Sequence, residues 1–214
     1  MTENLLVSAM KDSLVDEWEG TVADLMECSI DSILEDGVLK DIPVVGIAMS
    51  VCKTGLLIRE KHFMKELLLF IKALNSNQVS REKILEHKRM LDLNPKRAEK
   101  ELEGIILILD THIADAQSVR LGYFYKAYII KDISWEQFEE LKQVNQRIFE
   151  EDVKVLINLL KEEKVKENYR AFRLIGLGLV AERQIGYADG VLNLTTDEYE
   201  ITEFGRIFLK YMKE

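Results

Sequence analysis

Residues 42–58, with the sequence IPVVGIAMSVCKTGLLI, are almost entirely apolar or small, and this run decides the fold. Pro43 lies in the expected first turn of this helix, where the missing N–H of proline costs no hydrogen bond. Beyond Arg59, apolar residues keep helical spacing as far as Leu74. A helix that is apolar on all sides is normally buried among other helices. We therefore expect residues 42–74 to form the central helix of a multi-helix body.

Most of the remaining chain also carries apolar residues at helical spacing. Asn94 before Pro95, and Ser134 with Gln137 three residues later, are typical helix starts. The chain has only two prolines, which favours long helices. The pattern predicts a mainly α fold, with helices over residues 4–35, 80–91, 94–109, 115–131 and 134–160.

The last fifty residues have a different pattern. An apolar helix over residues 169–177 ends at Gly178, two short strands follow around a polar turn at Asp189 and Gly190, and Thr202 caps a final helix. The charged segment 162–166 separates this pattern from the helices before it. We therefore expect two domains, an all-helical body over residues 1–160 and a small α+β module over residues 161–214.

This C-terminal module resembles the winged-helix superfamily over about residues 151–214. The resemblance implies a hairpin wing between the two strands. It also places Lys166, Arg170 and Arg173 on the helix that contacts nucleic acid or a protein partner. The residues that carry the resemblance are Leu174, the segment Leu177-Gly178-Leu179-Val180 and the segment Tyr199-Glu200-Ile201-Thr202-Glu203-Phe204-Gly205-Arg206.

The helical body resembles uncharacterised bacterial proteins that join an apolar DIPVVG helix to a KAYI…ISWE stretch. In this chain those stretches are residues 41–46 and 126–138. The resemblance brings no catalytic residue. A sheltered apolar helix joined to a sensor-like module suits a component of phage defence or stress response.

Charge favours a protein partner over DNA for the C-terminal module. Residues 151–214 carry 10 basic and 12 acidic side chains, and the expected wing, residues 187–197, has no basic side chain. DNA binding needs Lys and Arg to neutralise phosphates. Elsewhere, residues 1–41 carry 2 basic and 11 acidic side chains, and residues 53–100 carry 12 basic and 6 acidic ones. We expect these two regions to lie against each other; the alternative is that the basic region faces an anionic partner.

No pattern in the sequence is typical of a catalytic or metal site. The three histidines are isolated, and none sits in a His-x3-His, Glu-x-x-His or Cys-x-x-Cys arrangement; they are His62, His87 and His112. The chain has neither a Gly-x-Ser-x-Gly elbow nor a glycine-rich phosphate loop. We expect no cofactor, no metal and no enzymatic activity. Because no secretion signal is seen, Cys28 and Cys52 are interpreted as reduced thiols of a bacterial cytoplasmic protein.

A membrane-active effector is one alternative. The apolar run has 17 residues, fewer than the roughly 20 that span a bilayer. A helix that is sheltered in the soluble protein and inserts on activation would bring the protein to the periphery of the inner membrane, where anionic lipids attract the basic residues after the run. The residues of this candidate segment are Val45, Ile47, Val51, Lys53, Leu56, Arg59 and Lys61.

The leading hypothesis is a non-enzymatic interaction or adaptor protein that binds a protein partner or a second copy of itself. It leads because the sequence contains every feature that this hypothesis requires. The alternatives are the membrane-active effector and a DNA-binding transcriptional regulator.

Overall fold

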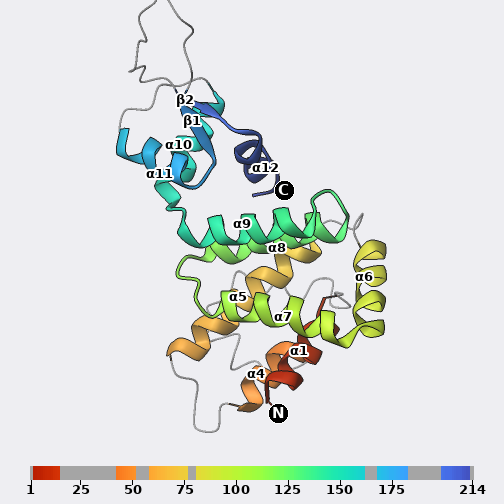
Figure 1. Ribbon diagram of the computed structural model, residues 1–214. Helices are drawn as coiled ribbons and strands as arrows, with labels where there is room; N and C mark the ends of the chain where they lie inside the picture. Colours follow the sequence, from red (N-terminus) through yellow and green to blue (C-terminus); the bar gives the residue numbers. More distant parts are fainter. Residues whose placement is uncertain are drawn as a thin grey trace, which may run out of the picture. The chain divides into compact units, whose positions relative to one another are not determined.

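The computed structural model describes residues 2–14, 42–51, 58–76, 81–161, 168–182 and 199–212 (Figure 1). These residues form ten helices and one two-stranded sheet near the C-terminus. The predicted fold class, mainly α with a small α+β module, is confirmed. The chain divides into two compact units, residues 1–138 and 139–213. The division lies within α9 (Trp135–Arg147), before the domain boundary that the sequence predicts at residues 160–161.

The first unit is a helical body in which α5 and α8 make the most extensive contact. Gly122 on α8 permits this contact, because a Cβ there would stand 2.6 Å from the carbonyl oxygen of Phe70 on α5. The helix α6 lies across the ends of α7 and α8 (Figure 1). The described helices before α9 in this unit are α1 (Thr2–Asp12), α4 (Pro43–Val51), α5 (Ile58–Asn75), α6 (Arg81–Leu93), α7 (Pro95–Leu109) and α8 (Asp115–Ile129).

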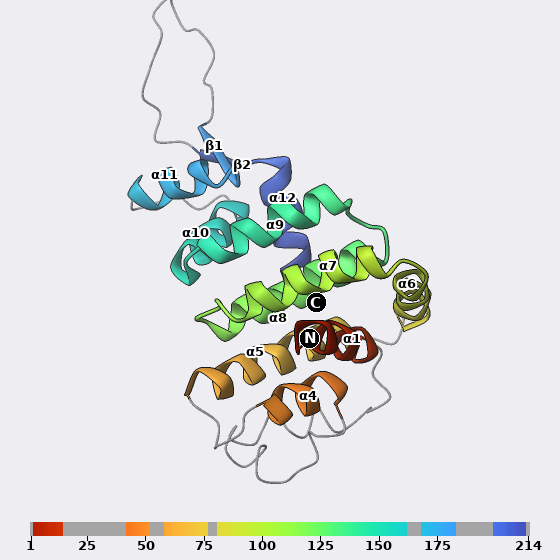
Figure 2. The ribbon, with the colours of Figure 1, turned by 60° about the horizontal axis from the view of Figure 1, so that its bottom comes forward.

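The prediction of one continuous helix over residues 42–74 is wrong. The described residues of this segment form two helices, α4 and α5, that contact each other (Figure 2), as one continuous helix would not. In α4, Val44 and Val45 are buried while Ser50 is exposed, so this helix packs one face on α1. The more deeply buried helix is α5, which buries an unbroken run from Glu66 to Ile71. Helical spacing is the same for one helix as for two in succession, and it therefore did not separate them.

Helix α1 covers only the start of the helix expected over residues 4–35; residues 15–41 lie outside the described part of the chain. Buried Ser13 joins the end of α1 to α4, because its Oγ accepts a hydrogen bond from the Val44 N–H at 3.0 Å. Asp12 also forms an ion pair with Lys88 on α6, with 3.2 Å between Oδ1 and Nζ. This pair is a small part of the contact expected between the acidic and basic regions.

Two helix starts predicted from the sequence are confirmed. Asn94 caps α7, accepting the backbone N–H of Arg97, and Pro95 follows at the first position. At the start of α9, Ser134 Oγ accepts the N–H of Gln137, and Gln137 Oε1 accepts the N–H of Ser134. This reciprocal pair is a capping box.

The helix expected over residues 134–160 is also two helices. The first, α9, ends at Arg147, and α10 (Glu150–Leu160) begins after Phe149, whose backbone is extended. Three acidic residues fill the first turn of α10, where they complement the positive end of the helix dipole. Buried Val144, Ile148 and Leu156 keep the spacing of a single helix, which is why the sequence does not show the break.

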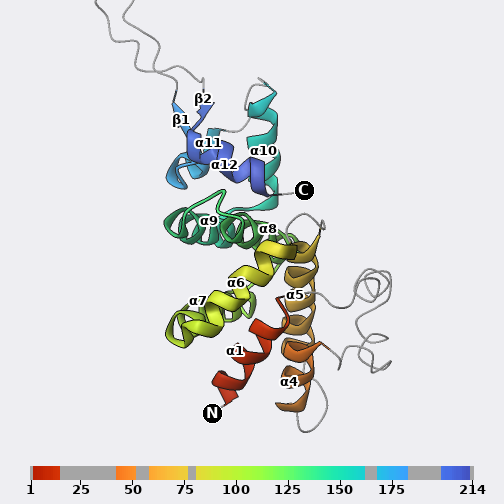
Figure 3. The ribbon, with the colours of Figure 1, turned by 90° about the vertical axis from the view of Figure 1, so that its right-hand side faces the viewer.

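The second unit also contains α11 (Asn168–Gly176), the strands β1 (Val180–Glu182) and β2 (Tyr199–Ile201), and α12 (Glu203–Tyr211) (Figure 3). The strands are antiparallel, with Val180 opposite Ile201. The helix α11 ends at Gly176, two residues before the expected Gly178, which lies in the turn before β1 with a left-handed φ of 73°. As expected, Thr202 caps α12 by accepting the N–H of Gly205. The predicted turn at Asp189 and Gly190 lies outside the described residues.

Candidate functional site

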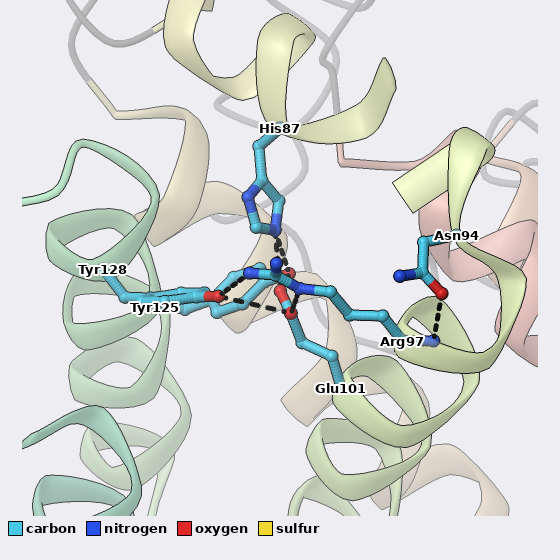
Figure 4. Close-up of polar contacts among 6 residues, drawn as sticks. All are labelled: His87, Asn94, Arg97, Glu101, Tyr125 and Tyr128. Carbon is cyan, nitrogen blue, oxygen red and sulfur yellow. Dashed lines mark hydrogen bonds and ion pairs between the residues drawn. The ribbon is translucent and has the colours of Figure 1, made fainter. Parts of the chain in front are cut away.

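A buried carboxylate, Glu101 on α7, is the centre of a polar network in the helical body (Figure 4). Glu101 lies on the face of α7 that also buries Leu102 and Ile105, and only 3% of its surface is exposed. Its oxygens accept hydrogen bonds from Tyr125 OH at 2.7 Å and from His87 Nε2 at 2.6 Å. Three helices, α6, α7 and α8, therefore meet at one carboxylate.

Two further side chains complete the network. Arg97, one turn before Glu101 on α7, donates from Nε to Glu101 Oε2 at 3.4 Å. The other arm of the same guanidinium donates from Nη2 to Tyr128 OH at 2.5 Å. Tyr128 OH lies 3.4 Å from Glu101 Oε2. The carboxylate is thus surrounded by donors, which is the condition under which a buried charge is tolerated.

The network keeps Glu101 ionised and its tyrosines protonated. Burial by itself raises the pKa of Glu101, but the hydrogen bond and charge of His87, with the bond from Tyr125, lower it below the ordinary value. Burial, together with the Glu101 charge, raises the pKa of Tyr125 well above its ordinary value. A carboxylate can only accept hydrogen bonds, so His87 Nε2 carries the proton that it shares with Glu101.

A pocket of about 530 Å³ opens beside this network. The rings behind it are packed closely: the centroids of Tyr128 and Trp135 are 5.2 Å apart, and those of Tyr128 and Phe138 are 5.8 Å apart. Such packing restricts the rotamers of the rings that form the wall. The residues lining the pocket are Lys83, Glu86, His87, Met90, Arg97, Tyr128, Ile129, Lys131, Asp132, Ile133 and Ser134.

This network was not predicted from the sequence, because its members lie on different helices and His87 is isolated in the sequence. One signal was present in the sequence: Glu101 occupies an apolar stripe of α7 together with Ala98, Leu102 and Ile105. An acidic residue in such a stripe is buried and needs donors from neighbouring elements. Among the described residues, no group of three His, Cys, Asp or Glu side chains has the arrangement of a metal site.

The structure brings together two of the three residues predicted to contact nucleic acid or a partner. Arg173 on α11 forms a bidentate pair with Asp152, with 2.9 Å from Nε to Oδ2 and 2.6 Å from Nη2 to Oδ1. Arg170 Nη1 lies 3.5 Å from Oδ1 of the same carboxylate. Asp152 is fully buried. The third residue, Lys166, lies outside the described residues.

Three large aromatic side chains around these arginines are exposed. Phe149, Tyr169 and Phe172 expose 59%, 52% and 57% of their surface, and we call this set the aromatic surface of the second unit. The Arg173 guanidinium lies over the rings of Phe149 and Tyr169, 4.7 Å and 5.2 Å from their centroids. Phe172 is one turn from Tyr169 on α11 and is its neighbour on the helix surface.

The described residues of the candidate membrane segment are partly buried in the helical body. Val45 is fully buried and Ile47 is half-buried. Arg59 forms an ion pair with Asp110, with 3.3 Å between Nε and Oδ1, and Lys61 is half-buried. The side chain of Val51 and the whole of Lys53 and Leu56 lie outside the described part. In the described ranges, no helix combines the length and the apolar character needed to cross a bilayer.

Comparison of the chain with models of protein families, with curated proteins and with solved structures gives no match.

Proposed function

We propose that this protein is a non-enzymatic interaction or adaptor protein that uses its C-terminal, winged-helix-like unit to bind a protein partner or a second copy of itself. The observation that carries the proposal is the exposure of Phe149, Tyr169 and Phe172 beside Arg173. Aromatic residues and arginine are the side chains most enriched in protein interfaces and at their energetic hot spots.

The aromatic surface is built to hold its shape. Arg173 is fixed by two hydrogen bonds to buried Asp152, and its guanidinium in turn supports the rings of Phe149 and Tyr169. Side chains that are already ordered lose less conformational entropy on binding. A fixed aromatic surface is therefore suited to a defined protein partner.

The same contacts weigh against DNA as the partner. Arg170 and Arg173 share the negative charge of Asp152, so the two arginines bring one net positive charge, not two, to a phosphate backbone. The membrane alternative requires α4 to insert into the bilayer, but Val44 and Val45 of α4 are buried in the helical body. A cytoplasmic location and a role in phage defence or stress response stay predictions.

The test is crosslinking from a photoreactive amino acid placed at Phe172, in cells that naturally produce the protein. Ile113 in the first unit, 88% exposed, is the matched control position. We expect a discrete crosslinked protein, or a crosslinked dimer, from position 172 and none from position 113. Sedimentation of the purified protein separates the dimer from a different partner. Crosslinks to nucleic acid, or the same products from both positions, would overturn the proposal.

A further inference from the structure

We propose that the pocket beside Glu101 binds a small molecule through an oxyanion, a phosphate or carboxylate group, that accepts a hydrogen bond from His87 Nδ1. The site lies wholly in the helical body, between α6, α7, the end of α8 and the turn after it. It is independent of the aromatic surface, so the proposal does not depend on the interaction function.

His87 is held in one orientation beside the pocket. Its Nε2 is held 2.6 Å from the Glu101 carboxylate and 3.2 Å from Tyr125 OH, and the ring meets the Tyr128 ring edge-on. This leaves Nδ1 on the side of the ring away from Glu101 (Figure 4). Nδ1 makes no hydrogen bond to any described residue, and His87 lines the pocket. The network therefore fixes the orientation of a mostly buried ring that lines the pocket, and Nδ1 is the ring nitrogen that the network leaves for a ligand.

Cations and acids surround the pocket in equal number. The groups that face it are three permanent cations, Lys83, Arg97 and Lys131, and three acids, Glu86, Asp132 and the underlying Glu101. Lys131 and Glu86 are paired at 4.0 Å. From α1, Lys11 and Asp12 pair with Asp92 and Lys88, which do not line the pocket. With neutral His87 the charges balance, and protonation of His87 leaves one net positive charge.

An oxyanion fits this arrangement because it can only accept hydrogen bonds. It is bound by the imidazolium form of His87, in which Nδ1 donates to the ligand and Nε2 donates to Glu101. Lys83 Nζ donates to the neutral carbonyl of Ile130 at 3.2 Å, and its remaining N–H groups are available to the anion. Apolar walls from Met90, Ile129 and Ile133 would contact the rest of the molecule.

The experiment is a titration of the full chain, with 15N-labelled histidine, followed by nuclear magnetic resonance at constant ionic strength. The probes are sulfate, a tetrahedral anion that does not titrate near neutral pH, and acetate as a carboxylate; chloride is the control salt. We expect saturable shifts of the His87 ring nitrogens toward the imidazolium values with sulfate or acetate. The sulfate and acetate arms distinguish a phosphate-like ligand from a carboxylate.

Variants separate a binding role from a structural one. His87→Gln should abolish the saturable binding, and Lys83→Gln should weaken it about tenfold by removing a charge-assisted bond from an exposed side chain. Arg89→Gln removes an exposed cation of α6 that does not line the pocket, and should leave binding within twofold. If His87→Gln does not fold, Lys83→Gln decides. Identical shifts with chloride, or binding by Lys83→Gln equal to that of the wild type, would overturn the proposal.

Discussion

Acidification is expected to destabilise the helical body through His112. This residue lies in the turn between α7 and α8, is 2% exposed, and places Nδ1 2.7 Å from Ser118 Oγ. Its Nε2 is buried and has no hydrogen-bond partner. Burial, then the charges of Arg120 and His62, lower the pKa of His112 to about 4. The folded protein therefore holds this ring neutral where the unfolded chain, with an ordinary histidine pKa of about 6.5, binds a proton.

The sign and size of the effect follow from proton linkage. Above about pH 6.5 both states are neutral, so His112 adds no pH dependence. Between that pH and pH 4 the unfolded state binds more protons, so stability falls as the pH falls. With the pKa lowered to about 4, the loss is about 2 kcal/mol at pH 5 and saturates near about 3 kcal/mol below pH 4.

The assay compares urea unfolding of the wild type and His112→Asn at pH 7.5 and pH 5. Tryptophan fluorescence reports on the body, because Trp18 and Trp135 both belong to residues 1–138. The wild type should lose about 2 kcal/mol more than the variant between the two pH values. Burial raises the pKa of Glu66, which acts in the opposite direction, but this contribution is common to both proteins. Equal losses in wild type and variant would refute the reasoning.

Three further substitutions test the packing and the buried charges. Gly205→Ala would place a Cβ 2.1 Å from the Leu179 carbonyl oxygen and should destabilise the second unit by about 3 kcal/mol or more. The control Gly176→Ala meets no atom within 4 Å and should change the stability of the unit by less than about 1 kcal/mol. Hydrogen exchange of the α12 amides measures both changes. Asp152→Asn removes the counter-charge that fixes Arg173 and should destabilise the second unit by the same measurement, with exposed Glu151→Gln as the near-neutral control. Tyr125→Phe removes a donor from buried Glu101 and should cost about 1–3 kcal/mol in urea unfolding of the body; an unchanged midpoint would show that Glu101 does not need this bond.

Features encoded within a few neighbouring residues were predictable from the sequence. The Asn94 cap, the Ser134–Gln137 capping box and the Thr202 cap each join a side chain to a backbone N–H three positions away, and the structure contains all three. The breaks between α4 and α5 and between α9 and α10 were not predictable, because apolar spacing keeps its phase across both. The Glu101 network was missed for a different reason: its donors come from α6 and α8, and sequence spacing says nothing about which helices meet.

The two sites use the same physical device in different surroundings. In each, a carboxylate on the buried side of a helix, Glu101 or Asp152, costs desolvation energy that hydrogen bonds from an arginine help to offset. Those bonds fix the arginine, and the arginine or its partners fix nearby aromatic rings. At Glu101 the fixed group is an imidazole that faces a pocket, whereas at Asp152 the fixed groups are rings that face solvent. The buried acid therefore orders each surface in the free protein, and its replacement is expected to impair the binding proposed for that surface.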